Sequence, residues 1–531
     1  ARHDQALGQS TRMNVTGGGN FILGYNARIM GVDLYVGQIS GNNLALYGEG
    51  DGAEWGGNVI IDNVDSTGSA GGITRNFVPR IQAASSNTVM HIDGNVYGGD
   101  TVVSPGAQAT ARLFTTLTGA SLTTLDFMGQ IRDKSTGAID LSAGDTLNDV
   151  LRMEVAASTD TANVHLYQQY DSAGRITIVR GVLRYMGSGN FYTDAAALAQ
   201  TPDSDLSGFQ MGGRSVISGD GTDASDVGFF LHNAGTSFNL SSWNVGVDTT
   251  DPDNSLGNSN YGLGNTTGDT SLGGENNSGT ITFGTGAGSI RFTQATTLYN
   301  RNLNLYAARG GTVDMKVNFL DGGSLVNSSI TKVGAGTVRL LGSSAGDSTV
   351  EALNMLGGTL LLTGYDVNAS RRVGNGVALT LSGGYLIVDA TAGTAQEDFS
   401  DLTLNSGGSR LAVRGSATVN INSAITLNPA SGVTMAFVEN GGGVINISAP
   451  GLTTTDGARF GYWAVYGNAL GQVTDWAARE GTTGVKAFTA YDVNTFASGN
   501  NTEVTTSATL AGPTATNSIK FAAAADLNLG G

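Results

Sequence analysis

Cysteine is absent from this chain of 531 residues, and proline and histidine are scarce, with 7 and 4 copies. Without cysteine there is no disulfide framework, no thiolate metal site and no cysteine nucleophile. No apolar run reaches the roughly 18 residues that a membrane-spanning helix needs, so the sequence predicts no such helix. Charged residues are also sparse, at 13%.

The charge that is present is mostly negative. The formal net charge is −17. Nucleic acid or an anionic membrane surface would need a clustered basic stripe, and the few lysines and scattered arginines do not form one. The sequence therefore predicts no nucleic-acid partner. An acidic exterior fits solubility or cation binding.

Glycine is abundant, at 80 residues, while hydrophobic residues make up 40% of the chain. The glycines follow no Gly-x-y period, which excludes collagen, and the hydrophobic content is too high for a disordered chain. Helix-forming residues at a period of 3.6 are few. Abundant Ser, Thr, Asn and Gly with little charge is typical of the exterior of a β-solenoid.

Two short runs of alternating apolar residues, at Thr337–Leu341 and Thr359–Leu362, have the pattern of half-buried strands. Each follows a small-residue corner, Gly334-Ala335-Gly336 or Gly357-Gly358, where positive φ angles are accessible. Between them, Ser343–Thr349 has no large apolar side chain and is expected to be a loop. This order of strand, bend and strand predicts coils of about twenty residues in an all-β solenoid.

The same stretch resembles a known repeat. Ile330–Leu340 contains Thr-Lys-x-Gly-x-Gly-Thr, and Gly357–Leu362 supplies a downstream Gly-Gly-Thr-Leu. Together they resemble the autotransporter-associated β-strand repeat. The resemblance implies an all-β fold, a right-handed parallel β-helix with loop insertions, of the kind found in secreted and surface-displayed bacterial passenger domains. It implies no catalysis.

Composition divides the chain into four parts. The expected parts are a solenoid region at 1–233, a loop insertion rich in Asn, Gly and Asp at 234–278, a second solenoid region at 279–459, and an aromatic-bearing excursion that leads into a further repeat at 460–531. In the last part, Ala477–Glu480 is expected to form one helical turn. Leu141–Val155 is expected to be a short helix or an irregular strand.

A similar sequence pattern occurs in two of these parts. Ser289-Ile290-Arg291-Phe292 precedes a Leu-Asn-Leu run, and Ser518-Ile519-Lys520-Phe521 precedes another close to the last residue. The second unit stops soon after it begins. We therefore expect either a longer array of repeats or an end that meets another subunit.

The histidines show no catalytic pattern. His3, His91, His165 and His232 occur in neither a Gly-x-Ser-x-Gly context nor a His-x-x-x-His pair. Polysaccharide lyases and hydrolases with β-helices use carboxylates from adjacent coils, which are far apart in sequence, so an enzyme of this type stays an alternative. Aromatic candidates for stacking on sugars are Trp55, Trp243, Trp463 and Tyr385, for which we expect caps or core packing instead.

Two acidic loops have oxygen ligands at the short intervals that Ca²⁺ requires. Their candidate ligands are Asp220, Asp223, Asp226, Asp248, Asp251 and Asp253. Neither loop matches a twelve-residue calcium loop or a glycine-rich calcium nonapeptide. We expect Asx turns on the exterior there, and we predict no catalytic residue, cofactor or metal site.

These observations predict a structural protein without enzymatic activity. It would be extracellular, at a bacterial cell surface, and would associate with itself end to end into fibres or filaments. Two alternatives stay open: an adhesin or autotransporter passenger that binds glycans or matrix, and a β-helix polysaccharide lyase or hydrolase.

Overall fold

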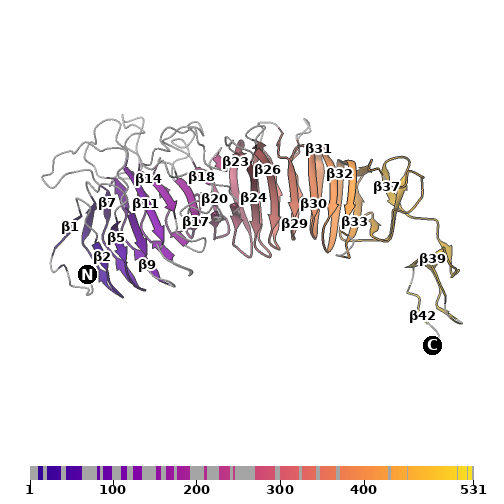
Figure 1. Ribbon diagram of the computed structural model, residues 1–531, viewed down its shortest axis with the longest axis horizontal. Coiled ribbons are helices and arrows are strands. Elements are labelled where there is room, and N and C mark those ends of the chain that lie inside the picture. Colours follow the sequence, from indigo (N-terminus) through magenta and orange to yellow (C-terminus); the bar gives the residue numbers. More distant parts are fainter. Residues whose placement is uncertain are drawn as a thin grey trace. The chain divides into compact units, whose positions relative to one another are not determined.

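Strands are the only regular elements in the described part of the computed structural model (Figure 1). That part comprises residues 7, 10–15, 21–36, 44–61, 80–83, 88–98, 109–115, 124–133, 135, 151–156, 163–172, 176–191, 209–211, 227–239, 243–245, 270–292, 299–321, 326–342, 347–365, 371–428, 432–450, 452–510, 512, 514–522 and 524–528. The all-β class predicted from the sequence is confirmed.

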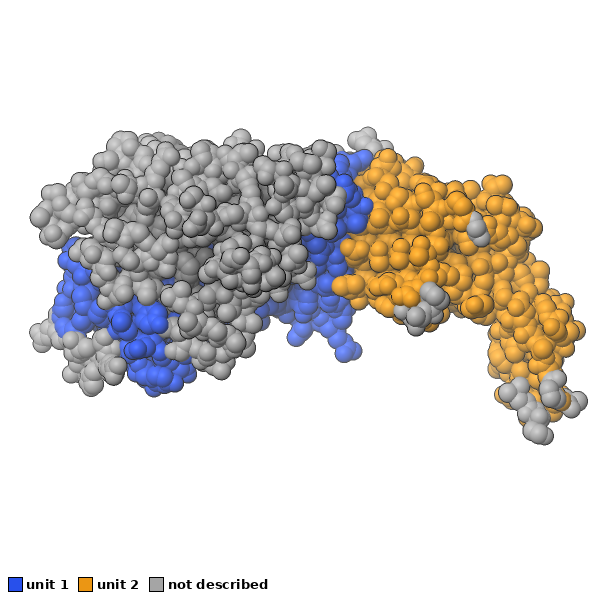
Figure 2. Space-filling model, in the orientation of Figure 1, with its two compact units in different colours: residues 1–352 blue, residues 353–531 orange. Residues whose placement is uncertain are grey.

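The chain divides into two compact units, residues 1–352 and 353–531, which are coloured separately in Figure 2. The strands of the first unit are β1 (Arg12–Val15), β2 (Phe21–Leu23), β3 (Arg28–Ile29), β4 (Asp33–Val36), β5 (Leu44–Gly48), β6 (Ala53–Trp55), β7 (Val59–Ile61), β8 (Arg80–Ala83), β9 (Val89–Ile92), β10 (Val96–Gly98), β11 (Ala109–Thr115), β12 (Thr124–Phe127), β13 (Ile131–Arg132), β14 (Leu151–Ala156), β15 (Asn163–Leu166), β16 (Tyr170–Asp171), β17 (Ile176–Tyr185), β18 (Phe209–Met211), β19 (Val227–Leu231), β20 (Ser237–Phe238), β21 (Trp243–Val245), β22 (Thr270–Gly274), β23 (Thr280–Phe292), β24 (Tyr299–Ala307), β25 (Thr312–Asp321), β26 (Val326–Val333) and β27 (Thr337–Leu340).

The second unit begins within β28 (Ala352–Met355). Its further strands are β29 (Thr359–Leu362), β30 (Asn375–Leu381), β31 (Gly384–Leu404), β32 (Gly408–Leu427), β33 (Thr434–Asn440), β34 (Val444–Ile447), β35 (Ala464–Gly467), β36 (Asp475–Glu480), β37 (Gly484–Ala487), β38 (Asp492–Val493), β39 (Asn501–Val504), β40 (Ala508–Thr509), β41 (Ser518–Phe521) and β42 (Leu527–Asn528).

From β1 to β16 the chain returns to the same sheet after every three strands. One sheet has the order β1-β4-β7-β10-β13-β16, and all its neighbours are parallel. The ladders β2-β5-β8-β11-β14 and β3-β6-β9-β12-β15 repeat the same step. Each coil of the chain is therefore hydrogen-bonded to the coils before and after it.

Burial alternates along these strands, as period-2 side-chain orientation requires. The pattern of half-buried and buried residues is the same in β9, β15, β27 and β29. Buried residues of successive coils stack on one another. In the first unit, the rings of Phe191, Phe229, Phe238 and Phe283 are buried and lie 5.2–6.2 Å from their neighbours.

A stacked corner shows why glycine recurs at fixed places. A Cβ on Gly57, Gly94 or Gly129 would lie 1.9, 2.1 or 2.2 Å from a carbonyl oxygen of the preceding coil, which only glycine avoids. The residue after each glycine links the coils. The backbone N–H of Asn95 donates to the side-chain oxygen of Asn58 (3.0 Å), and that of Gln130 donates to Asn95 (2.8 Å).

Coil length varies more than the sequence predicts. Paired residues of neighbouring coils are 19 positions apart at Asn163 and Val182, and 46 apart at Gly181 and Val227. Part of the predicted insertion at 234–278 also belongs to the ladders, because β20, β21 and β22 pair in parallel with β23 or β24. The predicted helix or irregular strand at Leu141–Val155 falls partly outside the described residues, and its last residues belong to strand β14.

The second unit contains parallel ladders, followed by strands that pair in the antiparallel sense. β29, β31, β32, β33 and β35 pair in parallel, in that order. β36 and β37 then form an antiparallel hairpin that pairs with β35 and β34. The helical turn predicted at Ala477–Glu480 is wrong. Those residues belong to β36, where Arg479 is buried and donates to the carbonyls of Ile447 and Thr483.

Both segments with the similar sequence pattern are strands. Ser289–Phe292 is the last part of β23, and Ser518–Phe521 is β41. β41 pairs in parallel with β39 and is an edge strand of its sheet. Phe292 is fully buried, whereas Phe521 is 52% exposed. In β23 the next coil covers these side chains, since Ile290 and Phe292 pair with residues of β25.

Lys332, the lysine of the Thr-Lys-x-Gly motif, is buried inside the first unit. Its ammonium donates to the carbonyl oxygens of Val333 and Gly334, both at 2.7 Å. Gly334 has a φ of 77°, which turns the chain at this corner. Burial lowers the pKa of Lys332 to about 8. The motif therefore places one buried cation against the carbonyls of a tight bend.

Replacing this lysine should destabilise the first unit. We expect Lys332→Ala to lower the free energy of unfolding by about 3 kcal/mol, because it removes a buried side chain and the donor to two carbonyls. Lys316→Ala, at a half-buried position of β25, is the matched control and should cost less than about 1 kcal/mol. Urea denaturation followed by circular dichroism measures both, and equal losses would contradict this role for Lys332.

Candidate functional site

The candidate calcium ligands Asp220, Asp223, Asp226, Asp248, Asp251 and Asp253 all lie outside the described residues, as does His3. Of Trp243, only the backbone in β21 is described. Within the described part of the chain, no group of three or more His, Asp or Glu side chains is arranged to hold a metal ion.

The remaining histidines lie in or beside a column of polar residues on the first unit. Parallel register aligns Glu54, His91, Asp126, His165 and Arg184 on β6, β9, β12, β15 and β17. Each is opposite its neighbour on the next strand, so their side chains project from the same face of the sheet. We call these five residues the polar column.

Asp126 lies between two imidazoles at the centre of this column. Its Oδ2 is 3.3 Å from Nδ1 of His91, and its Oδ1 is 3.0 Å from Nδ1 of His165. Asp126 is buried, and Oδ1 accepts no hydrogen bond from the described residues. The contact is therefore one of proximity between ionisable groups, and it strengthens when an imidazole is protonated.

Further charges flank the column at both ends. Arg28 pairs with Glu54 at 2.5 Å, and this hydrogen bonding holds the pKa of the Glu54 carboxyl below its usual value. At the other end, Nε of Arg184 donates to both oxygens of Glu275, at 2.9 and 3.0 Å. His232 also lies near that carboxylate, with Nδ1 3.5 Å from Oε2.

Sequence reasoning missed this column because its members are separated by whole coils. The spacing of the corner residues in the sequence would have identified the polar column. Asn58, Asn95 and Gln130 are hydrogen-bonded at spacings of 37 and 35 residues, and His91 and Asp126 share that second spacing. A carboxylate, two imidazoles and flanking arginines on one face supply groups that can exchange protons and neutralise anions.

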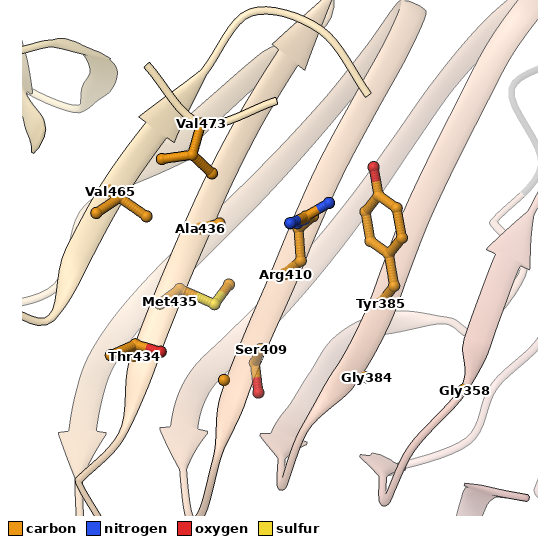
Figure 3. A pocket seen from close by; sticks show the side chains of 11 residues that line it. Gly358, Gly384, Tyr385, Ser409, Arg410, Thr434, Met435, Ala436, Val465 and Val473 are labelled. Carbon is orange, nitrogen blue, oxygen red and sulfur yellow. The ribbon is translucent and has the colours of Figure 1, made fainter. Parts of the chain in front are cut away.

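A groove lies on the outer face of the second unit (Figure 3). Register aligns Tyr385, Arg410, Ala436 and Val465 across β31, β32, β33 and β35. The small side chain of Ala436 leaves a depression between Arg410 and Val465. Val473, from the connection between β35 and β36, lines it as well, and the cavity measures about 460 Å³.

One cation and one phenol give the groove its polarity. The Arg410 guanidinium lies 5.1 Å from the centre of the Tyr385 ring. The Tyr385 hydroxyl is buried and makes no hydrogen bond of normal geometry with the described residues. Burial raises the pKa of Tyr385, and the nearby charge of Arg410 offsets part of that rise. Tyr385, one of the aromatic candidates, is therefore at a surface cavity.

Two other aromatic candidates are part of the core, as predicted. Trp55 is fully buried, and its ring lies 5.3 Å from Phe21 in an edge-on arrangement. Trp463 is also buried and lies 6.2 Å from Phe437. Neither ring offers a face to a sugar.

A buried carboxylate occupies the interior of the second unit. Glu397 is completely buried, and its Oε1 accepts from the Tyr365 hydroxyl and from the backbone N–H of Arg372, both at 2.7 Å. Its Oε2 has no hydrogen-bond partner among the described residues. Burial raises the pKa of Glu397 to about 7, although the hydrogen bonds to Oε1 oppose the rise.

Comparison with known proteins gives no match for this chain among family models, curated proteins or solved structures. The described residues also form no helix that is long and apolar enough to cross a membrane.

Glu397 should make stability depend on pH. Its folded pKa of about 7 exceeds the ordinary value of 4.5, so folding favours the protonated form. This contribution is complete below about pH 4.5 and is lost as pH rises through about 7, a change on the order of 3 kcal/mol.

We expect the stability of the Glu397→Gln variant to change less with pH over this range than that of the wild type. At pH 8 the variant should unfold at a higher urea concentration than the wild type. Urea midpoints measured from pH 4 to 8 test this. Glu49→Gln, at an exposed position, is the control and should leave the profile as it is. If the urea midpoint of the wild type does not decrease as the pH rises from about 4.5 to 7, the assignment is contradicted.

Proposed function

We propose that the chain is a right-handed parallel β-helix that serves as a structural element of a bacterial surface and performs no reaction. The parallel, in-register pairing of strands from successive coils supports the β-helix. It recurs from β1 to β16 in the first unit and from β29 to β35 in the second. The surface location is supported only by the motif in Ile330–Leu340.

Self-association is proposed from an exposed apolar edge strand among the described residues. β41 is an edge strand, and Ile519 and Phe521 on it are 37% and 52% exposed. Ile290 and Phe292, which have similar neighbours in the sequence, are buried, and their strand pairs with β25. An edge strand with exposed apolar side chains is a template for a further strand. We propose that a coil of another copy adds there and extends the sheet into a fibre.

Electron microscopy and sedimentation velocity of the purified chain test this proposal. We expect fibres or end-to-end oligomers from the wild type and single particles from Phe521→Glu, because a buried carboxylate at the junction would be costly. Tyr462→Glu, at another exposed aromatic residue of the second unit, should assemble as the wild type does. Wild-type particles that stay single at high concentration would overturn the filament role.

The polar column favours a second candidate, a polysaccharide lyase or hydrolase. Asp126 between His91 and His165 is an acid–base group on adjacent coils. Incubation with acidic and neutral polysaccharides, followed by detection of new reducing ends, distinguishes the two candidates. Under the structural proposal no turnover is expected. Turnover that Asp126→Asn abolishes would establish the enzyme instead.

A further inference from the structure

The groove of the second unit contains a cation that the protein does not neutralise. Two other arginines on the strands of this unit, or beside them, pair with carboxylates. Arg414 lies 2.8 Å from Asp389, and Arg371 lies 2.6 Å from Asp398. No carboxylate in the described part of the chain pairs with Arg410, whose contact is the ring of Tyr385. Arg410 is also the one charged side chain among the described residues that line the groove.

The other groove residues specify more than a charge. Thr434 adds a hydroxyl group, while Val465 and Val473 add apolar surface opposite Arg410 (Figure 3). An occupant that matches this lining has a carboxylate, hydroxyl groups and an apolar face. A guanidinium pairs with a carboxylate through two parallel hydrogen bonds, which gives orientation as well as attraction.

Backbone pairing argues against a peptide in this groove. Along the groove, β32 is hydrogen-bonded to β31 on one edge and to β33 on the other. Extended peptides bind to sheets by adding a strand to a free edge, and the middle of this sheet has none. Recognition must therefore come from side chains that project from the sheet.

We propose that this groove binds an acidic carbohydrate, with a uronate carboxylate on Arg410 and the sugar ring against Tyr385 and the apolar wall. Tyr385, Arg410, Ala436 and Val465 are in register on successive strands. Their spacing of roughly 4.8 Å is close to the length of one sugar unit, so a short chain would cross the strands. The cavity volume of about 460 Å³ lies within the range of small-ligand sites. This binding is independent of the proposed structural role.

Calorimetric titration of the full chain tests the proposal with two probes. One is a uronic-acid trisaccharide, and the other is the same trisaccharide with its carboxylates reduced to alcohols. We expect the acidic probe to bind at least about tenfold more tightly, as a charge-assisted pair predicts. Equal affinity for both probes, or no binding of the acidic one, would overturn it.

Variants locate the site. Arg410→Ala should weaken binding of the acidic probe at least about tenfold, and Arg410→Lys should weaken it less, because lysine keeps the charge without the planar fork. Arg309→Ala, at an exposed arginine of the first unit, should bind as the wild type does. Unchanged binding by a folded Arg410→Ala variant would overturn the proposal.

A second variant avoids any effect on Arg410 itself. Val473 is 43% exposed at the groove, so a substitution there should not disturb folding. Val473→Asp places a carboxylate opposite the ligand and should weaken binding several-fold, whereas Val473→Asn should bind as the wild type does. Tri-glutamate is the peptide probe. Binding of tri-glutamate as tight as that of the acidic trisaccharide would assign the groove to acidic peptides instead.

Discussion

Hydrogen bonding between the backbones of successive coils is the constraint on which the rest of this structure depends. Strands β1 to β13 pair in parallel with the strand three positions later, and β22 to β25 pair with the strand two positions later. Parallel strands in register place each side chain directly beside its counterpart from the neighbouring coil. The core, the corners and the surface columns are therefore all consequences of one repeated pairing.

This constraint explains why polar groups gather without any local motif. Asp126 meets two histidines because its strand lies between theirs and the register is kept. Tyr385 meets Arg410 for the same reason. The two surfaces differ in their balance of charge. The polar column contains carboxylates and bases together, whereas the groove has a cation without a carboxylate. The first arrangement is largely neutralised within the protein, and the second attracts an external anion.

Local features of the fold could be predicted from the sequence. The strands at Thr337–Leu340 and Thr359–Leu362 follow from alternation between glycine corners, which requires only neighbouring residues. That Ser289–Phe292 and Ser518–Phe521 are both extended also follows from their sequences. Ala477–Glu480 was predicted incorrectly because helix propensity is weak compared with the pairing of β36 to β35 and β37.

The candidate sites could not be predicted, because their geometry depends on the lengths of the connections. Coil lengths range from 19 residues at the pair Asn163–Val182 to 46 residues at the pair Gly181–Val227. No fixed period would align His91, Asp126 and His165 by inspection. Tyr385 was singled out as an aromatic residue, but its neighbour Arg410 is known only once β31 and β32 are in register.

Variable coil length has a consequence for how such a chain can change. The corner formed by Gly57, Gly94 and Gly129 keeps its stacking although the intervals between its coils differ. Residues can thus be inserted into or removed from a connection while the strands on either side stay aligned. New segments can be grafted between coils, and the surface columns would persist as fixed anchor points beside them.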